Sequence, residues 1–242
     1  MPILGAPAFR SRGPVVSRNR LHVLVIVLIV FLAMWSHGGG AGQPSRDILH
    51  RIVARCLDSS VPDYCVWCLA PVRGQCALDG DCRRTTEVWA QTDEYVVIGD
   101  IKMCGCPADF VHGLAMPRAL VSGVEDPKRP SGIWPFAWAV ARQRVSEEME
   151  IGLAVNPADL RSQDYLHIHL VRLRQDARKR LASRNPLRVE RLEEVWDAAA
   201  RHAAGLGLRS YGVIVARASD GNFLVAADDG SPEREFTEYA CR

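Results

Sequence analysis

Residues 165–173 read Tyr165-Leu166-His167-Ile168-His169-Leu170-Val171-Arg172-Leu173. Apolar side chains at positions 166, 168 and 170 alternate with Tyr165, His167 and His169. Because successive side chains of a strand point to opposite faces, this alternation predicts a β-strand with one face toward the core. His167 and His169 then share the other face, about 6.5 Å apart along the strand. Both imidazoles can therefore address one bound group.

The residues before this strand add polar groups to the same region. Residues 150–157 form another predicted strand, which ends at Asn156-Pro157, and the polar turn 159–164 contains Ser162 and Gln163. In a hairpin these hydroxyl and amide groups come close to the histidines and can bind an anionic oxygen. Asn156, Ser162 and Gln163 are therefore the predicted phosphate ligands.

The histidine pair has three interpretations at this stage. A neutral imidazole backed by a carbonyl is a good nucleophile toward phosphorus, and a second histidine can bind the phosphoryl oxygens. A His-x-His pair can also bind a metal, although the only nearby carboxylate, Asp164, lies out of register for a three-ligand site. The third interpretation is two ordinary strand histidines without a function.

The rest of the chain alternates between strand and helix patterns. The predicted helices cover residues 47–56, 134–145, 174–181 and 188–204, and the further strands cover 95–102, 110–117, 211–216 and 223–227. Asp220-Gly221 is a hairpin turn between the last two strands. Neighbouring strands pair locally while helices intervene, so we expect an α+β fold with a mainly antiparallel sheet and packed helices.

The charge is divided unevenly between two parts of the chain. The net charge of +2 is too small for a nucleic-acid-binding protein. Four arginines and no acidic residue precede position 46, whereas the other 26 basic residues face 28 acidic ones. Residues 21–35 are apolar except for His22, and Gly39-Gly40-Ala41 offers a peptidase site. This layout predicts a basic cytoplasmic leader over 1–20 and a signal peptide or signal anchor over 21–41, with a buried core helix as the alternative.

Residues 42–242 would then be exported and held at the cell (inner) membrane on its extracytoplasmic side. In an oxidising compartment disulfides are the first interpretation of the cysteines. Zinc bound by Cys65-x-x-Cys68 and Cys104-x-Cys106 and a redox-active Cys65-x-x-Cys68 are the alternatives. The eight cysteines all lie in this part, at positions 56, 65, 68, 76, 82, 104, 106 and 241.

Ser162-Gln163-Asp164-Tyr165-Leu166-His167-Ile168-His169-Leu170 resembles the signature of the histidine-triad superfamily. The order of further motifs along the chain is similar to one branch, the CDP-diacylglycerol pyrophosphatases. These motifs are the helix at 47–53 with Cys56, the strand at 95–100, Leu114-Ala115-Met116-Pro117, residues 122–127, the helix at 138–142, Ala154-Val155-Asn156-Pro157, and the strand at 223–225 with Cys241.

The resemblance implies a hydrolase that cleaves the pyrophosphate of CDP-diacylglycerol to CMP and phosphatidic acid. His167 would be the nucleophile and His169 would contact the phosphoryl group, while Asn156, Ser162 and Gln163 would bind its oxygens. The scheme needs no metal or other cofactor. It also implies a membrane-held domain that acts on a liponucleotide, and a dimer, since superfamily members are often dimers or fused pairs.

The sequence departs from the family pattern at two places. Tyr165 stands where the first histidine of the triad would be, and we interpret the change as tolerated. The resemblance implies far fewer cysteines and a bridge from Cys56 to Cys241. This chain has in addition a cysteine-rich insertion near 65–106. These departures keep two rival functions open: a non-catalytic, disulfide-rich nucleotide- or phosphate-binding module, and a zinc-dependent hydrolase that uses His167 and His169.

Overall fold

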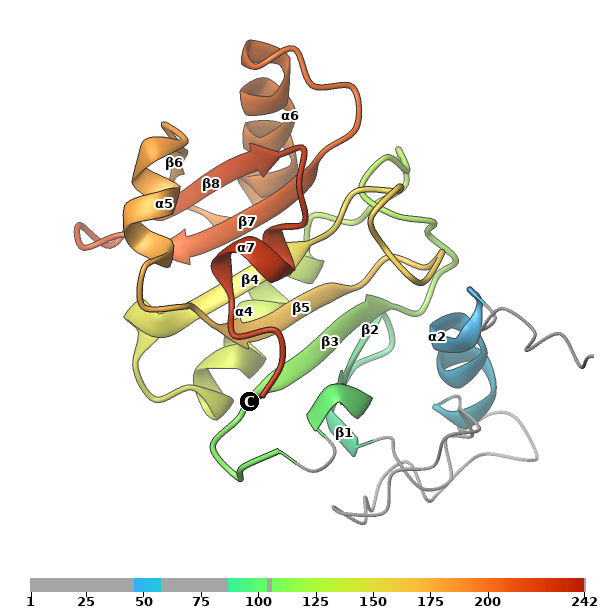
Figure 1. Cartoon of the computed structure of the whole chain (residues 1–242). Helices are drawn as coiled ribbons and strands as arrows, with labels where there is room; N and C mark the ends of the chain where they lie inside the picture. The colour runs from blue at the N-terminus through green and yellow to red at the C-terminus, as the bar shows by residue number, and fades with distance from the viewer. Residues whose placement is uncertain (1–45, 58–86, 104–105, 242) are drawn as a thin grey trace, which may run out of the picture. The chain divides into compact units, whose positions relative to one another are not determined.

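The computed structural model describes residues 46–57, 87–103 and 106–241, all within a folded unit that spans Ser45–Arg242. Within these residues, eight strands form one antiparallel sheet in the order β1-β2-β3-β5-β4-β7-β8-β6 (Figure 1). The strands are β1 Glu87–Gln91, β2 Tyr95–Gly99, β3 His112–Pro117, β4 Ile151–Val155, β5 Ile168–Arg172, β6 Leu187–Val189, β7 Gly212–Arg217 and β8 Phe223–Asp228. The expected α+β class is confirmed.

Helices join the strands and cover the sheet. The α-helices of the described residues are α2 Ile48–Arg51, α4 Ile133–Arg144, α5 Ala177–Ser183, α6 Val195–Gly205 and α7 Pro232–Phe236. The short helices are the π-helix η1 Ile52–Cys56, which continues α2, and the 3-10 helices η3 Ile101–Met103, η4 Glu148–Glu150 and η5 Leu192–Glu194. None of the described helices is long and apolar enough to cross a membrane.

Alternation along the strands sends apolar side chains to both faces of the sheet. Ile168 and Leu170 of β5 belong to the large core cluster that α4 and α6 cover. On the opposite face, Leu49 of α2 and Val53 of η1 pack over β2 and β3. The helices α5 and α7 pack on that same face over β4 and β7. His169 alternates with Ile168 and Leu170, so it lies on the second face, between these two groups of helices.

Both sides of β5 are buried, which differs from the expected strand with one face toward the core. The histidine face is covered because α2 packs on one side of it and α7 on the other. Along α2 and η1, Leu49 and Val53 are buried, whereas Ile48 and Ile52 remain partly exposed.

Three elements were not expected from the sequence. They are β1, which pairs with β2, the edge strand β6, which pairs with β8, and the helix α7. The expected helix over 188–204 begins only at Val195, because residues 187–189 pair with β8 instead. The β7–β8 hairpin is confirmed, and Gly221 adopts the left-handed conformation at φ 89° that its turn requires.

The C-terminal segment crosses back over the sheet after α7. Thr237 pairs with Leu173, and the N–H of Glu238 donates to the carbonyl of Arg172. This path brings Cys241 to Cys106, and the two form a disulfide with their Cα atoms 5.6 Å apart. The Cys56–Cys241 bridge that the resemblance implies is therefore wrong, because the end of the chain follows β5 to the segment before β3. Residues 58–86 and 104–105, and with them most cysteines of the expected insertion near 65–106, lie outside the described residues.

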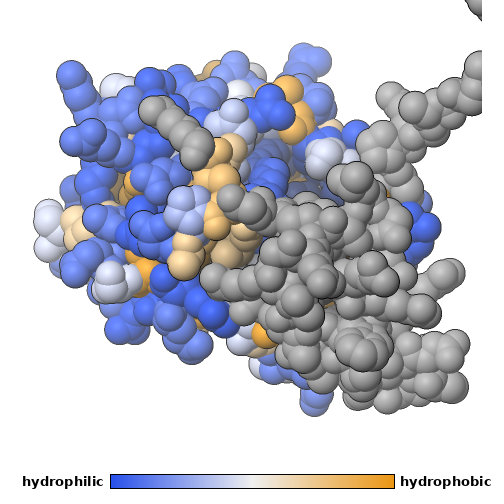
Figure 2. Space-filling model, turned by 60° about the horizontal axis from the view of Figure 1, so that its bottom comes forward, coloured by the Kyte–Doolittle hydropathy of each residue, from blue (hydrophilic) through white to orange (hydrophobic). Residues whose placement is uncertain are grey.

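The surface of the described residues is mainly polar on the face shown in Figure 2, where small apolar groups are surrounded by hydrophilic side chains. The exposed large apolar side chains are scattered along the chain: Leu120, Met149, Leu160, Leu206 and Tyr239. Isolated apolar residues of this kind are normal on a protein surface. The less ordinary feature is a set of buried polar groups, which includes His112, His167 and His169.

Candidate active site

His167 lies one residue before β5 and is buried, with 6% of its surface exposed. Its Nδ1 atom lies 2.6 Å from the carbonyl oxygen of Tyr165. A carbonyl oxygen only accepts, so Nδ1 carries the proton and Nε2 carries the lone pair of the neutral ring. Burial lowers the pKa of His167, which keeps the ring neutral.

Tyr165 occupies the position of the missing triad histidine without entering the site. Its hydroxyl donates to the carbonyl oxygen of Pro117, and its ring packs against that of His50 with the centroids 5.3 Å apart. Burial raises the pKa of Tyr165, so the hydroxyl keeps its proton. The side chain is therefore part of the packing beneath α2.

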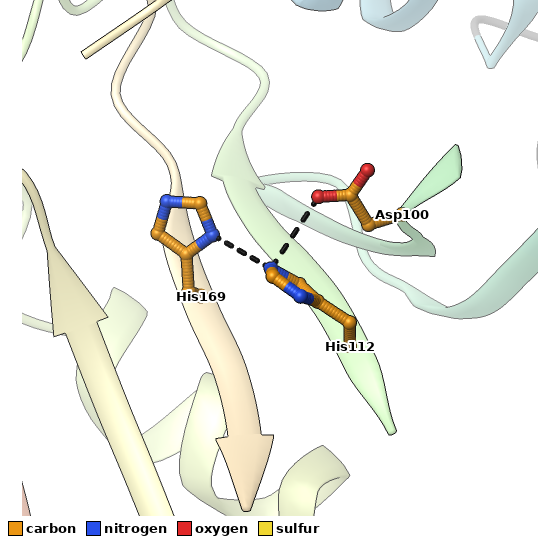
Figure 3. A group of neighbouring side chains, drawn as sticks. All are labelled: Asp100, His112 and His169. Atoms are coloured by element: carbon orange, nitrogen blue, oxygen red, sulfur yellow. Dashed lines mark hydrogen bonds and ion pairs between the residues drawn. The ribbon is translucent and has the colours of Figure 1, made fainter. Parts of the chain in front are cut away.

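His169 forms a buried pair with His112 of β3 (Figure 3). The register places Leu114 opposite His169, so His112 is the diagonal neighbour on the same face. Nε2 of His112 lies 3.0 Å from Nδ1 of His169. Burial lowers the pKa of both histidines, and the neighbouring His167 lowers that of His169 further. Both rings are therefore neutral in the folded protein.

Two carboxylates face this pair. Asp100 follows β2, and its Oδ2 lies 3.4 Å from Nε2 of His112. Glu233 comes from α7, with Oε1 3.5 Å from Nε2 of His112 and Oε2 3.4 Å from Nε2 of His169. Lys102 forms an ion pair with Glu233 Oε1 and lies 4.0 Å from Asp100 Oδ2. Burial raises the pKa of Glu233, but the ion pair with Lys102, together with His112 and the hydrogen bond from Asn156, keeps that pKa below its ordinary value.

Asn156 links the histidines to α7. Its Nδ2 donates to Glu233 Oε2 at 2.7 Å and lies 3.4 Å from Nε2 of His169. Its Oδ1 accepts from the hydroxyl of Ser231 at 2.8 Å. The expected proximity of Asn156 to the histidines is confirmed, and its amide is also used to hold Glu233 in place.

Ser162 and Gln163 belong to the loop before β5, and this loop is attached to α2. The Oε1 atom of Gln163 accepts from the N–H of Leu49 at 3.3 Å, and its Nε2 donates to the carbonyl of Ser162 at 3.1 Å. Ser162 is exposed. Among the described residues, no hydrogen bond joins Ser162 to His167 or His169.

The structure thus adds His112, Asp100, Glu233 and Lys102 to the residues chosen from sequence. His112 could have been identified from the sequence. It is a polar residue at the start of an otherwise apolar strand, and such residues are often functional. Ser231-Pro232-Glu233 is a helix-start pattern. Nothing in that pattern points to the histidines, since α7 reaches them only by folding back over β4 and β7.

The model of the CDP-diacylglycerol pyrophosphatase family matches residues 66–233, which is more than half of the chain. The chain belongs to this family. Its members are hydrolases of a phosphoanhydride bond, and the chain is accordingly a CDP-diacylglycerol pyrophosphatase that acts on a liponucleotide. No curated protein matches the chain.

The family match includes every residue of the buried cluster. It ends at Glu233, and the three histidines, Asn156 and Asp100 lie within it. The polar cluster on the second face of the sheet is therefore the candidate active site of this pyrophosphatase. Its neutral histidines offer lone pairs for nucleophilic attack or for binding a cation.

Proposed function

We propose that the chain hydrolyses CDP-diacylglycerol with His167 as the nucleophile. The hydrogen bond from Nδ1 of His167 to the Tyr165 carbonyl carries this proposal. It leaves the lone pair on Nε2, which makes no hydrogen bond to any of the described residues. Because burial keeps the ring neutral, this lone pair is available at neutral pH.

In the first step, Nε2 of His167 attacks the phosphorus next to the cytidine. A P–N bond forms while the P–O bond to the second phosphate breaks, and phosphatidic acid leaves with the electron pair. The imidazole gains positive charge, which the Tyr165 carbonyl stabilises through Nδ1–H. Water then attacks the same phosphorus, the P–N bond breaks, and CMP and the neutral histidine are released.

The residues around the nucleophile have supporting roles. His169 lies beside His167, with ring centroids 4.8 Å apart, and contacts the phosphoryl group. Asn156 holds His169 and Glu233 in place and offers its amide to the same oxygens. Ser162 and Gln163 bind phosphate oxygens at the entrance, which requires the loop before β5 to turn its side chains toward the substrate.

The substrate also motivates a proposal for location. CDP-diacylglycerol is a membrane lipid, so its pyrophosphate lies at the bilayer surface. The basic leader and the apolar segment over 21–41 would hold the domain of residues 42–242 at the extracytoplasmic side of the cell membrane. A homodimer is the expected assembly, and sedimentation of the purified full chain tests it.

Replacement of the nucleophile tests the mechanism. We expect His167→Ala to lower the release of CMP from CDP-diacylglycerol at least about 10³-fold, because no other group supplies the attacking nitrogen. Turnover in EDTA should equal turnover without it. His50→Ala, which removes a histidine outside the cluster, is the control for folding and should retain activity.

Trapping the intermediate tests the same step directly. The full-length protein is incubated with CDP-diacylglycerol that is labelled in the cytidine, and the reaction is stopped in alkali, in which phosphoramidates are stable. Label should remain on the wild-type protein and be absent from His167→Ala. Wild-type turnover in the variant, with a melting temperature like that of the wild type, would contradict His167 as the nucleophile.

A further inference from the structure

Three donor atoms of the buried cluster meet at one place (Figure 3). A carboxylate oxygen of Asp100, one ring nitrogen of His112 and one of His169 all lie within 4.8 Å of one another. Two imidazoles and a carboxylate are a donor set typical of zinc and other borderline divalent cations, and not of magnesium or calcium. We propose that Asp100, His112 and His169 bind a zinc-class divalent cation.

The distances suit an ion of this size. Ligands at about 2.1 Å from a tetrahedral zinc lie about 3.4 Å from one another. The His112–His169 contact is 3.0 Å and the His112–Asp100 contact is 3.4 Å, so an ion fits after small shifts of the side chains. Nε2 of His112 takes part in both contacts, so it is the atom of this ring that would bind the ion.

The surroundings supply the support that metal-bound histidines usually have. A cation on Nδ1 of His169 places the proton of that ring on Nε2, which faces Glu233 Oε2 at 3.4 Å. A carboxylate that accepts from the far nitrogen orients a histidine ligand and raises its basicity. Asn156 in turn holds Glu233 by its hydrogen bond of 2.7 Å.

The local charge also favours a cation. Two carboxylates, Asp100 and Glu233, face a single ammonium group, that of Lys102, among neutral histidines. The Lys102 side chain is 39% exposed, so it can swing into solvent when an ion enters. Lys102 and the ion therefore compete for the same carboxylates. Removal of the Lys102 charge should accordingly strengthen binding of the ion.

This site goes beyond the proposed reaction, because the ion carries no step of it and shares only His169 with it. Binding is therefore measured apart from turnover, on the full-length protein after removal of metal with a chelator. Titration with Zn²⁺ by calorimetry gives affinity and stoichiometry, and the visible spectrum with Co²⁺ reports nitrogen and oxygen ligation.

We expect Asp100→Asn to weaken Zn²⁺ binding at least about tenfold, because a charged ligand is lost. Lys102→Met should tighten it about tenfold, because a competing positive charge is removed. Asp220→Asn, which changes an exposed carboxylate in the β7–β8 turn, is the control and should bind as the wild type does. Any zinc that the cysteines bind contributes equally to the titrations of the wild type and of the three variants, so it does not affect the differences between them.

The outcomes separate this proposal from the catalytic one. Wild-type affinity in Asp100→Asn, or weaker binding in Lys102→Met, would overturn the cation site. His167→Ala should be inactive but bind Zn²⁺ as the wild type does. If that variant hydrolyses CDP-diacylglycerol, the nucleophile assignment fails while the cation site stands.

Discussion

At the scale of single residues, one hydrogen bond determines which nitrogen of His167 can react. The Tyr165 carbonyl is 2.6 Å from Nδ1 and therefore keeps the lone pair on Nε2. Tyr165 itself packs against His50 and donates its hydroxyl to the Pro117 carbonyl. A tyrosine is accommodated where the superfamily has a histidine because its backbone acts on the site and its side chain does not.

Under the proposed mechanism, the acid limb of the pH profile reports the protonation of His167. Burial lowers the pKa of His167 from the ordinary value of 6.5, so the ring stays neutral as the pH falls to that value. We expect kcat/KM to be constant from pH 7.5 to 6.5 and to fall only at lower pH, as protonation removes the lone pair. Initial rates measured from pH 7.5 to below pH 6.5 test this expected profile.

An acid limb centred above pH 6.5 would contradict a buried neutral nucleophile. The control is the melting temperature at each pH. It distinguishes protonation of His167 in the native protein from loss of the fold, since the buried neutral histidines also make the folded state less stable as the pH falls below their unfolded value of about 6.5.

At the scale of elements, α7 matters more than its five residues suggest. Its N-cap is Ser231, whose hydroxyl accepts from the N–H of Arg234 and donates to Oδ1 of Asn156. The helix brings Glu233 to His112 and His169. It can lie so close to β4 and β7 because Gly212 has no side chain at the contact.

Gly212→Ala tests this packing. A Cβ atom there would lie 2.5 Å from the carbonyl oxygen of Val155 and 2.6 Å from Cδ of Pro232. We expect a loss of about 2 kcal/mol in the free energy of unfolding. We also expect a lower kcat, because α7 must move and carry Glu233 away from the histidines. Denaturant unfolding and initial rates measure the two effects.

Gly205→Ala is the matched control, because a Cβ at the end of α6 meets nothing within 4 Å. This variant should keep wild-type activity and unfold at the same or a slightly higher denaturant concentration. Equal behaviour of the two alanine variants would show that α7 does not depend on close contact at Gly212.

At the scale of the whole folded unit, the disulfide joins parts of the chain that lie 135 residues apart. Cys106 comes shortly after Lys102, and Cys241 comes shortly after Glu233. The bridge therefore fastens both segments that contribute the Lys102–Glu233 ion pair to the cluster. A cavity of about 710 Å³ opens beside it, lined by Phe110, Tyr239 and Cys241 among others.

Removal of the bridge should destabilise the fold. We expect Cys241→Ser to lower the free energy of unfolding by about 3 kcal/mol, because the cross-link no longer restricts the unfolded chain. Cys106→Ser and the double variant should show the same loss, because each of the three variants lacks the Cys106–Cys241 disulfide. Peptide mapping of the oxidised wild type should recover the Cys106–Cys241 pair, and a different partner for Cys241 would contradict the structure.

Local patterns account for most of the elements that the sequence predicts correctly. Alternation along residues 165–173 predicts β5 and the closeness of His167 to His169, and Asp220-Gly221 predicts the last hairpin. Local patterns fail where long-range pairing decides. The apolar spacing over 188–204 is helical, yet residues 187–189 pair with β8. Likewise, Cys241 pairs with Cys106 because of the route the chain takes after α7.

The amino-acid sequence alone predicts the α+β class, the family, and the location of His167, His169 and Asn156 on or next to two neighbouring strands. These features depend on side-chain period and on motifs within a few dozen residues. The three-dimensional fold was needed to show that His112, Asp100 and Glu233 join them and that Gln163 contacts α2. The diagonal contact of β3 with β5 and the return of α7 depend on strand order and packing across the whole sheet, which no local pattern specifies.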